Sequence, residues 1–77
     1  MATNDPHFDD QVPESLTRRE RDILVLLAQD LSDREIADRL VVSVSTVKWY
    51  NRQIYGKLGV HSRTQALVQA KTLNLLP

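Results

Sequence analysis

The segment STVKWYNRQIYGKL, residues 45–58, places Lys48 and Arg52 four residues apart. On a helix this spacing projects both side chains from one side, where they can donate to guanine O6 and N7 or to phosphate oxygens. Trp49 and Gln53 lie beside them. Glutamine can read adenine, and an indole can press on a thymine methyl group. These four residues form the predicted base-reading face of a DNA-binding helix. The alternative for Trp49 is that its ring lies flat on its own helix and covers Arg52.

A second group of residues could hold the DNA backbone. Free backbone amides at a helix N-terminus, here those of Val44, Ser45 and Thr46, can meet a phosphate together with neighbouring hydroxyl groups. Ser43 begins the same helix, where simple capping is part of its role. An arginine in the preceding helix and two cations after the base-reading face could clamp the flanking strands, whereas Lys71 is better explained as a solvated side chain. The predicted backbone contacts are Arg34, Ser43, Ser45, Thr46, Lys57 and Arg63.

The charge of the chain is unevenly distributed, although its formal net charge is zero. Residues 1–14 hold four acids and no Lys or Arg, a net −4, and residues 15–42 hold five arginines against six acids, a net −1. Residues 43–77 hold five cations and no acid, a net +5. This asymmetry favours a polyanionic partner for the C-terminal half, although a solvated basic face explains the charge alone equally well.

The composition excludes several classes of protein. A chain of 77 residues allows one domain with a modest core. It has no cysteine, which suits a reducing cytosol, and no apolar run approaches the roughly 20 residues that span a membrane, so a cytoplasmic location is expected. The two histidines, His7 and His61, belong to no nucleophile–base pair, metal-ligand spacing or glycine-rich phosphate loop. We therefore expect no enzyme, no metal and no cofactor.

The elements that position these side chains are marked by helix caps. The segments TRRE at 17–20 and SDRE at 32–35 have the capping-box pattern, and SRTQ at 62–65 repeats it with glutamine. Another helix begins at Ser43 and runs to about residue 58, where Gly59 is the expected left-handed stop. We predict an all-α fold of four short helices within residues 14–77. Residues 1–13, with two prolines and an acidic bias, are predicted to be a disordered tail or a linker.

Apolar residues at helical spacing define the predicted core. Leu16 precedes the first helix as a staple, Leu31 closes the core behind it, and Asn74 is the stop of the last helix. The predicted inward positions of the four helices are Ile23, Leu24, Leu27 and Ala28; Ile36, Ala37 and Leu40; Val47, Tyr50, Ile54 and Leu58; and Ala66, Leu67, Ala70 and Leu73.

The second and third helices form a recognisable unit. A stub helix, a tight turn at Val41 and Val42 and a longer helix make a helix-turn-helix. The stub braces the longer helix, which leaves one face of the latter free to enter the DNA major groove, whose width fits an α-helix. The first three helices would then form a tri-helical core, with the fourth packed after it.

Residues 16–76 resemble the LuxR-type (GerE-like) helix-turn-helix DNA-binding domain. The motifs LTRRE, EIADRL, STVK, KLGV and SRTQA occur in order and at the family's spacing. Any one of them would be weak, but the five together are specific. The phrase TVKWYNRQIYGKLGVHSRTQA looks most like the large ATP-dependent MalT-type regulators. The resemblance implies the output domain of a bacterial transcriptional regulator, behind a receiver, a sensing domain or an ATPase module.

The resemblance also implies roles for individual residues. It implies base-edge contacts for Lys48, Trp49 and Arg52 and phosphate contacts for Ser45, Thr46 and Lys48. The family's dimer surface lies on the last helix, which here implies Val68 and Thr72 and a weak homodimer on inverted half-sites. Val68 as an ordinary exposed apolar residue is an equal alternative.

Four positions raise separate expectations. The family often has Gly where Asp30 stands, so a looser corner after the first helix is expected. It usually has His where Tyr50 stands and an apolar residue where Asn51 stands, and the second change predicts softer packing along the third helix. Gly56 inside that helix predicts a close approach to the backbone of DNA or of another helix.

The sequence therefore predicts sequence-specific binding of double-stranded DNA, with a recognition helix of about residues 43–58 in the major groove. The competing hypothesis is a protein-interaction module whose basic face docks on RNA polymerase or a sensor partner. The two are separated by titration with duplex DNA, because the second predicts no binding even at low salt.

Overall fold

The structure is a computed structural model that describes residues 16–76, and within them it contains helices and no strand. The helices are α2 (Arg18–Ala28), α3 (Asp33–Leu40), α4 (Val44–Leu58) and α5 (Arg63–Thr72). The predicted all-α fold with four short helices is confirmed. The predicted tail, residues 1–13, lies outside the described residues.

Two of the three predicted capping boxes are complete. The Thr17 hydroxyl accepts from the Glu20 amide at 3.1 Å, and the Glu20 carboxylate accepts from the Thr17 amide at 2.8 Å. Ser32 and Glu35 repeat these contacts at the same two distances.

The third box, before α5, differs from the prediction. The Ser62 hydroxyl accepts from the Gln65 amide at 3.2 Å, but the Gln65 side chain accepts from the amide of His61, one residue earlier than expected, at 2.8 Å. The cap backbone is the physical difference, since φ is −149° at Ser62 against −74° at Thr17 and Ser32. The rotated backbone changes the direction of the Ser62 N–H, and the preceding amide takes its place.

Each helix is followed by a residue in the left-handed conformation, namely Asp30 (φ 67°), Val41 (φ 59°), Gly59 (φ 71°) and Asn74 (φ 60°). Gly59 and Asn74 confirm the predicted stops. The corner at Asp30 closes without glycine, because the Asp30 amide donates to the carbonyl of Leu27 at 3.0 Å. Val41 is the unfavourable case, since a β-branched side chain crowds its own backbone there.

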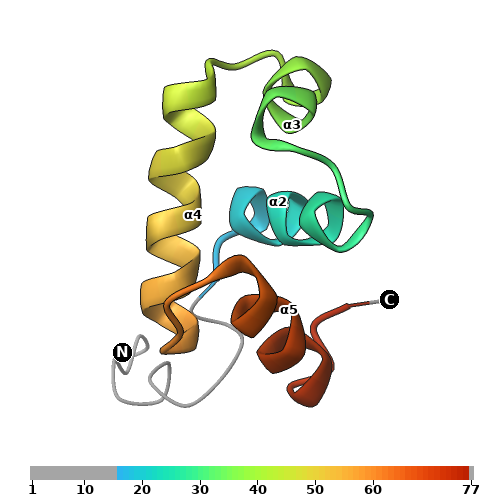
Figure 1. The fold of residues 1–77 in the computed structure, drawn as a ribbon, viewed down its shortest axis with the longest axis vertical. Coiled ribbons are helices and arrows are strands. Elements are labelled where there is room, and N and C mark those ends of the chain that lie inside the picture. Colours follow the sequence, from blue (N-terminus) through green and yellow to red (C-terminus); the bar gives the residue numbers. More distant parts are fainter. Residues whose placement is uncertain (1–15, 77) are drawn as a thin grey trace, which may run out of the picture.

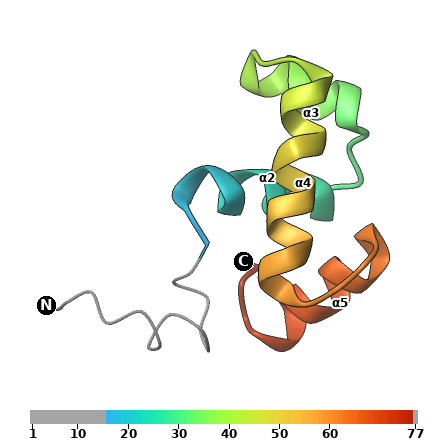
Figure 2. The ribbon, with the colours of Figure 1, turned by 90° about the vertical axis from the view of Figure 1, so that its left-hand side faces the viewer.

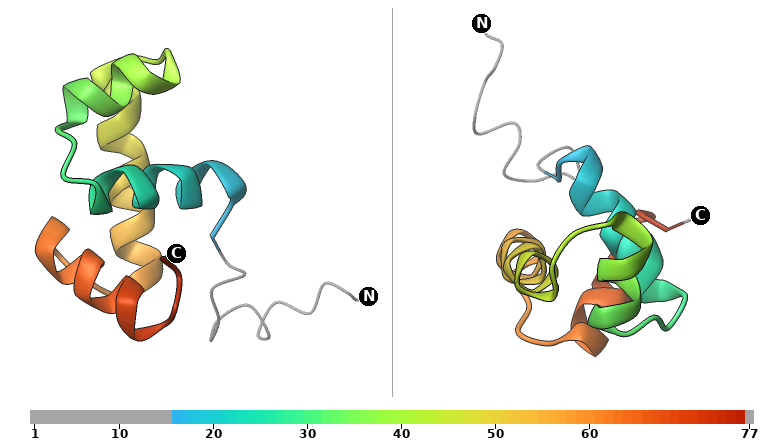
Figure 3. Two further views of the ribbon diagram at one scale, coloured as in Figure 1. Left: turned by 90° about the vertical axis from the view of Figure 1, so that its right-hand side faces the viewer. Right: turned by 90° about the horizontal axis from the view of Figure 1, so that it is seen from above.

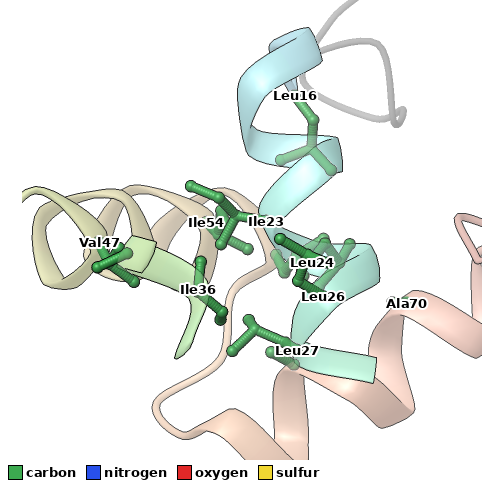
Figure 4. Close-up of a cluster of buried hydrophobic side chains, with 12 residues drawn as sticks. Leu16, Ile23, Leu24, Leu26, Leu27, Ile36, Val47, Ile54 and Ala70 are labelled. Carbon is green, nitrogen blue, oxygen red and sulfur yellow. The ribbon is translucent and has the colours of Figure 1, made fainter. Parts of the chain in front are cut away.

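The core lies where α2, α3 and α4 meet, and α5 closes it from one end (Figure 4). Most predicted inward residues are buried, with Ile23, Leu27, Ile36, Val47 and Ile54 fully so. Leu31, Leu40, Tyr50 and Leu67 are partly buried against this core.

Two predicted core positions are wrong. Ala28 is exposed, and Leu26 is buried instead. The buried face of α2 is turned from the predicted stripe because α2 contacts all three other helices. Leu73 is also exposed, because α5 ends at Thr72 and helical periodicity no longer holds after it. Leu75 packs against the core in its place.

The long helix α4 stands against the other three. α3, α2 and α5 follow one another along its length (Figure 1), and the view in Figure 2 looks at α4 with the other helices behind it. From above, α4 lies to one side of the molecule (Figure 3, right). One face of α4 is therefore held by all three partners, while none of the other described helices covers the opposite face, which we call the free face.

Candidate nucleic-acid interface

The free face of α4 carries the predicted base-reading residues. Lys48 and Arg52 are exposed, Trp49 is 49% exposed and Gln53 is half-buried. Val47, by contrast, is fully buried on the opposite side. The structure thus brings the four predicted residues together on one side of α4, with the side chains of Lys48 and Arg52 exposed to solvent.

The Trp49 ring contacts its neighbour on the same helix. Its centroid lies 5.0 Å from that of Tyr50, and the two rings meet edge to face with an interplanar angle of 77°. Such a contact is favourable for aromatic pairs, and it orients the indole while half of its surface stays open. An oriented, half-exposed indole is suited to packing against a flat apolar group.

The N-terminus of α4 differs in one respect from the prediction. The Thr46 amide, expected to be free, donates to the Ser43 hydroxyl at 3.0 Å, and the hydroxyls of Ser43 and Thr46 share a hydrogen bond at 2.9 Å. Capping of the helix therefore takes up this amide and the hydroxyl proton of one of the two residues, while the other hydroxyl keeps its proton for a further acceptor. Ser45 is exposed beside them, and Arg34 is exposed in the first turn of α3.

Lys57, a predicted backbone clamp, has a partner inside the molecule. Its ammonium lies 2.8 Å from the carboxylate of Glu20. Glu20 as a whole residue is 3% exposed, its side chain is 4% exposed, and the side chain of Lys57 is 33% exposed. Burial by itself would raise the pKa of Glu20, but hydrogen bonds from Lys57 and from the Thr17 amide outweigh it, and the pKa lies below its ordinary value. The pair joins the end of α4 to the start of α2, and a phosphate would have to compete with Glu20 for Lys57.

Arg63, the other predicted clamp, is committed in the same way. Its guanidinium donates to the carbonyl of Leu27 at 3.2 Å and to that of Leu31, and it lies 4.0 Å from the exposed carboxylate of Asp30. Leu27 lies in the last turn of α2 and Leu31 follows the corner after it, so Arg63 adds hydrogen bonds on both sides of that corner. Its contacts are those of a residue that holds α5 against α2.

Sequence reasoning missed these cross-links, although a signal was present. Glu20 stands one turn before Ile23 and Leu24 on the buried stripe of α2, and Asn51 stands between Val47 and Ile54 on that of α4. A polar residue within an apolar stripe is buried and needs a partner. For Asn51 that partner is Asp33 of α3, whose carboxylate accepts from the Asn51 amide at 3.0 Å. The expectation of softer packing here did not include this bond.

Four further positions singled out in the sequence are not among the predicted DNA contacts. Val68 is 60% exposed on α5, and the Thr72 hydroxyl on the same helix donates to the Val68 carbonyl at 3.1 Å. A Cβ atom on Gly56 would meet nothing within 4 Å, so no other part of the described chain approaches it closely. His61 is exposed in the turn before α5.

In residues 16–76 no three His, Cys, Asp or Glu side chains are grouped so that they could hold a metal ion. No helix in that range has the length and apolar character to cross a membrane.

Comparison with known proteins agrees with this geometry. The sequence profile of the GerE family, described as "Bacterial regulatory proteins, luxR family", matches residues 14–70. The transcriptional regulatory protein LiaR of Bacillus subtilis is 43% identical over 82% of this chain and 30% of its own length. The Fimbriae Z protein of Escherichia coli K12 is 44% identical over 79% of this chain and 29% of its own. The chain thus spans about 30% of the length of these relatives.

Solved structures show the same arrangement. The response regulator ChrA of a heme-sensing two-component system superposes with a TM-score of 0.76 and 45% identity over 78% of this chain and 30% of its own. The transcription factor GerE superposes with a TM-score of 0.75 and 39% identity over 80% of this chain and 92% of its own. The chain belongs to the luxR family of bacterial regulatory proteins, and its residues 14–70 match that family's helix-turn-helix DNA-binding domain.

Proposed function

We propose that α4 enters the major groove of double-stranded DNA and reads base edges there. The observation that carries the proposal is the free face of α4, on which Lys48 and Arg52 are exposed with no acidic residue on the same helix. Lys48 and Arg52 donate to guanine or to nearby phosphates, Gln53 reads adenine, and Trp49 packs against thymine methyl groups.

Backbone contacts in this proposal come from both helices of the helix-turn-helix. Arg34 on α3 and Ser45 at the start of α4 are exposed and meet phosphates on either side of the groove. Ser43 and Thr46 contribute through the capped turn that they stabilise. Lys57 and Arg63 contact the DNA backbone only where a phosphate displaces their partners inside the protein.

The remaining parts of the proposal concern the assembly. Since the relatives are about three times as long as this chain, we assign it the role of the output domain of a larger regulator in the cytoplasm. Two copies would meet through α5, where Val68 is exposed beside Thr72, and bind inverted half-sites. Contact with RNA polymerase is a further proposed partner interaction. Each single contact is weak, and pairing on DNA raises the apparent affinity.

The experiment is selection of bound duplexes from a random pool by the wild-type chain, at low salt. We expect enrichment of one short sequence, and two inverted copies of it would reveal the dimer. The enriched duplex is then titrated with R52A, which should lose about 1–3 kcal/mol of binding free energy and relax one base position. The matched control is K71A, because Lys71 is exposed on α5 and not on α4.

Two outcomes would contradict parts of this proposal. No enrichment at any salt concentration would overturn DNA reading and favour a protein partner for the basic face. An R52A variant that weakens binding equally on every sequence would make Arg52 a phosphate anchor and remove it from the base-reading residues.

A further inference from the structure

Asn51 is a polar residue in the buried face of α4. It follows Val47 by four residues and precedes Ile54 by three, and it is 8% exposed. Every other buried residue of α4 is aliphatic. The amide is therefore placed where packing alone would favour a hydrocarbon.

The Asn51 amide reaches the neighbouring helix with only half of its hydrogen-bonding capacity. Its Nδ2 donates to the carboxylate of Asp33, in the first turn of α3, at 3.0 Å. Its Oδ1 is buried and has no hydrogen-bond partner within the described residues. Turning the amide over would set this oxygen against the carboxylate, so the donor must face Asp33. An apolar side chain at this position would avoid the cost of burying an oxygen without a hydrogen-bond partner. A contribution to the stability of the fold therefore does not explain why this position holds asparagine.

Buried apolar side chains form another part of the α3–α4 contact. Ile36 and Ala37 of α3 are buried in the same cluster as Val47 of α4. Apolar attraction has no preferred direction, so small rotations and shifts of α4 across this surface differ little in free energy. A hydrogen bond requires a short distance and a narrow angle, so it selects one arrangement among them.

The electrostatics agree that the Asp33 carboxylate faces α4. Tyr55 lies one turn after Asn51 on α4. Burial raises the pKa of the Tyr55 phenol, the negative charge of Asp33 raises it further, and Arg63 offsets part of the effect. The carboxylate thus acts on two successive turns of α4.

We infer that Asn51 and Asp33 are positioning residues that fix α4 against α3 and thereby set the distance between the DNA contacts of the two helices. Asp33 directly precedes Arg34, and Asn51 directly precedes Arg52. The bond between α3 and α4 therefore joins the residues immediately before a proposed phosphate contact and a proposed base contact. This inference rests on the proposed function.

The test compares two duplexes, the one enriched by the wild-type chain and a scrambled sequence of the same length and composition. In N51L the fold should be at least as stable as in the wild type, because the orphaned oxygen is gone. Affinity for the enriched duplex should fall about 3- to 10-fold while affinity for the scrambled duplex stays unchanged. N51A, which adds no volume, guards against a leucine that does not fit, and circular dichroism confirms that each variant is folded.

A double-mutant cycle shows whether Asn51 acts through Asp33. D33A should reduce discrimination between the duplexes in the same way, and N51L should cause no further loss in the D33A background. Independent, additive losses would overturn the inference, as would variants that discriminate as well as the wild type or weaken both duplexes equally. A wild-type chain that prefers no duplex is a different result: it overturns the proposed function and the inference together.

Discussion

At the residue scale, Glu20 shows how one side chain links local and tertiary structure. Its carboxylate closes the capping box of α2 and pairs with Lys57 at the end of α4. Glu35 closes the same kind of box on α3 but is exposed. The hydrogen bond from the Ser32 amide lowers the pKa of Glu35, so both carboxylates are stabilised as anions by their caps. Only Glu20 adds a cation from another helix.

This difference gives a prediction about pH. Glutamine can keep the capping box, so E20Q removes mainly the charge opposite Lys57 and should cost about 1 kcal/mol of unfolding free energy at pH 7. Because folding lowers the pKa of Glu20, its contribution is present above the ordinary value of 4.5 and is lost as the pH falls through the lower folded value. The gap between wild type and E20Q should therefore close at acidic pH, as measured by urea unfolding from pH 7 to pH 3.

The matched control for this prediction is E35Q, which alters the same type of cap without a partner from another helix. Its effect on stability should be smaller than that of E20Q at pH 7, and the two effects should converge as the pH falls. Equal effects of the two substitutions would show that the cap, and not Lys57, accounts for the role of Glu20.

The two buried polar residues Glu20 and Asn51 show what the sequence could reveal about the site. The positions of Glu20 and Asn51 within apolar stripes mark them as inward-facing. Their partners, Lys57 and Asp33, are 37 and 18 residues away in the chain. Such pairings depend on how the helices pack, which spacing along one helix does not encode. The outward face of α4 was predictable because it is the complement of its own stripe.

At the element scale, helix starts were predictable because a cap is decided within four residues. The caps at Thr17, Ser32 and Ser43 formed as expected, and the Ser62 box changed only through its own backbone angle. The misplaced residues, Ala28 and Leu73, lie in the last turn of α2 and just beyond α5. At these positions the packing of the neighbouring helices and the end of the helix determine which side chains are buried. The spacing of apolar residues at helical periodicity does not determine it.

The turn between α3 and α4 holds strain that a substitution can relieve. Val41 has φ 59° and is 89% exposed, so its side chain gains little packing in return for the left-handed backbone. V41G should raise the free energy of unfolding by about 0.5–1 kcal/mol. This is the gain from relieving the crowding of the valine side chain, reduced by the larger conformational entropy that glycine has in the unfolded chain. Urea unfolding at pH 7 measures the change.

The neighbouring valine provides the control for this prediction. Val42 is half-buried against the core, and its amide donates to the Ala37 carbonyl at 2.9 Å. V42G should therefore destabilise the fold by about 1–2 kcal/mol. If V41G also destabilised it, Val41 would be making contacts that its exposure does not reveal, and the strain argument would be wrong.

At the scale of the whole molecule, the fold divides the cations of the basic C-terminal half into two sets. Lys57 and Arg63 are held by Glu20 and by the carbonyls at the end of α2. The other three are exposed, Lys48 and Arg52 on the free face of α4 and Lys71 on α5. The net charge of +5 for residues 43–77 therefore overstates the charge that is readily offered to a polyanion.

This division predicts the salt dependence of DNA binding. Arg34, Lys48 and Arg52 each bring a positive charge close to the phosphates, whether they donate to a phosphate or to a base edge in the groove. Release of about three counterions should therefore give log K against log salt a slope of about −3 on a duplex with a single half-site. K48A should reduce the slope by about 1, and K71A should leave it unchanged. Fluorescence anisotropy of labelled duplex measures the slope between 50 and 200 mM salt, roughly the range in which such slopes are resolved.

A slope near −5 would mean that Lys57 and Arg63 leave their internal partners for phosphates. In that case E20Q, which removes the negative charge beside Lys57, should bind DNA more tightly than the wild type.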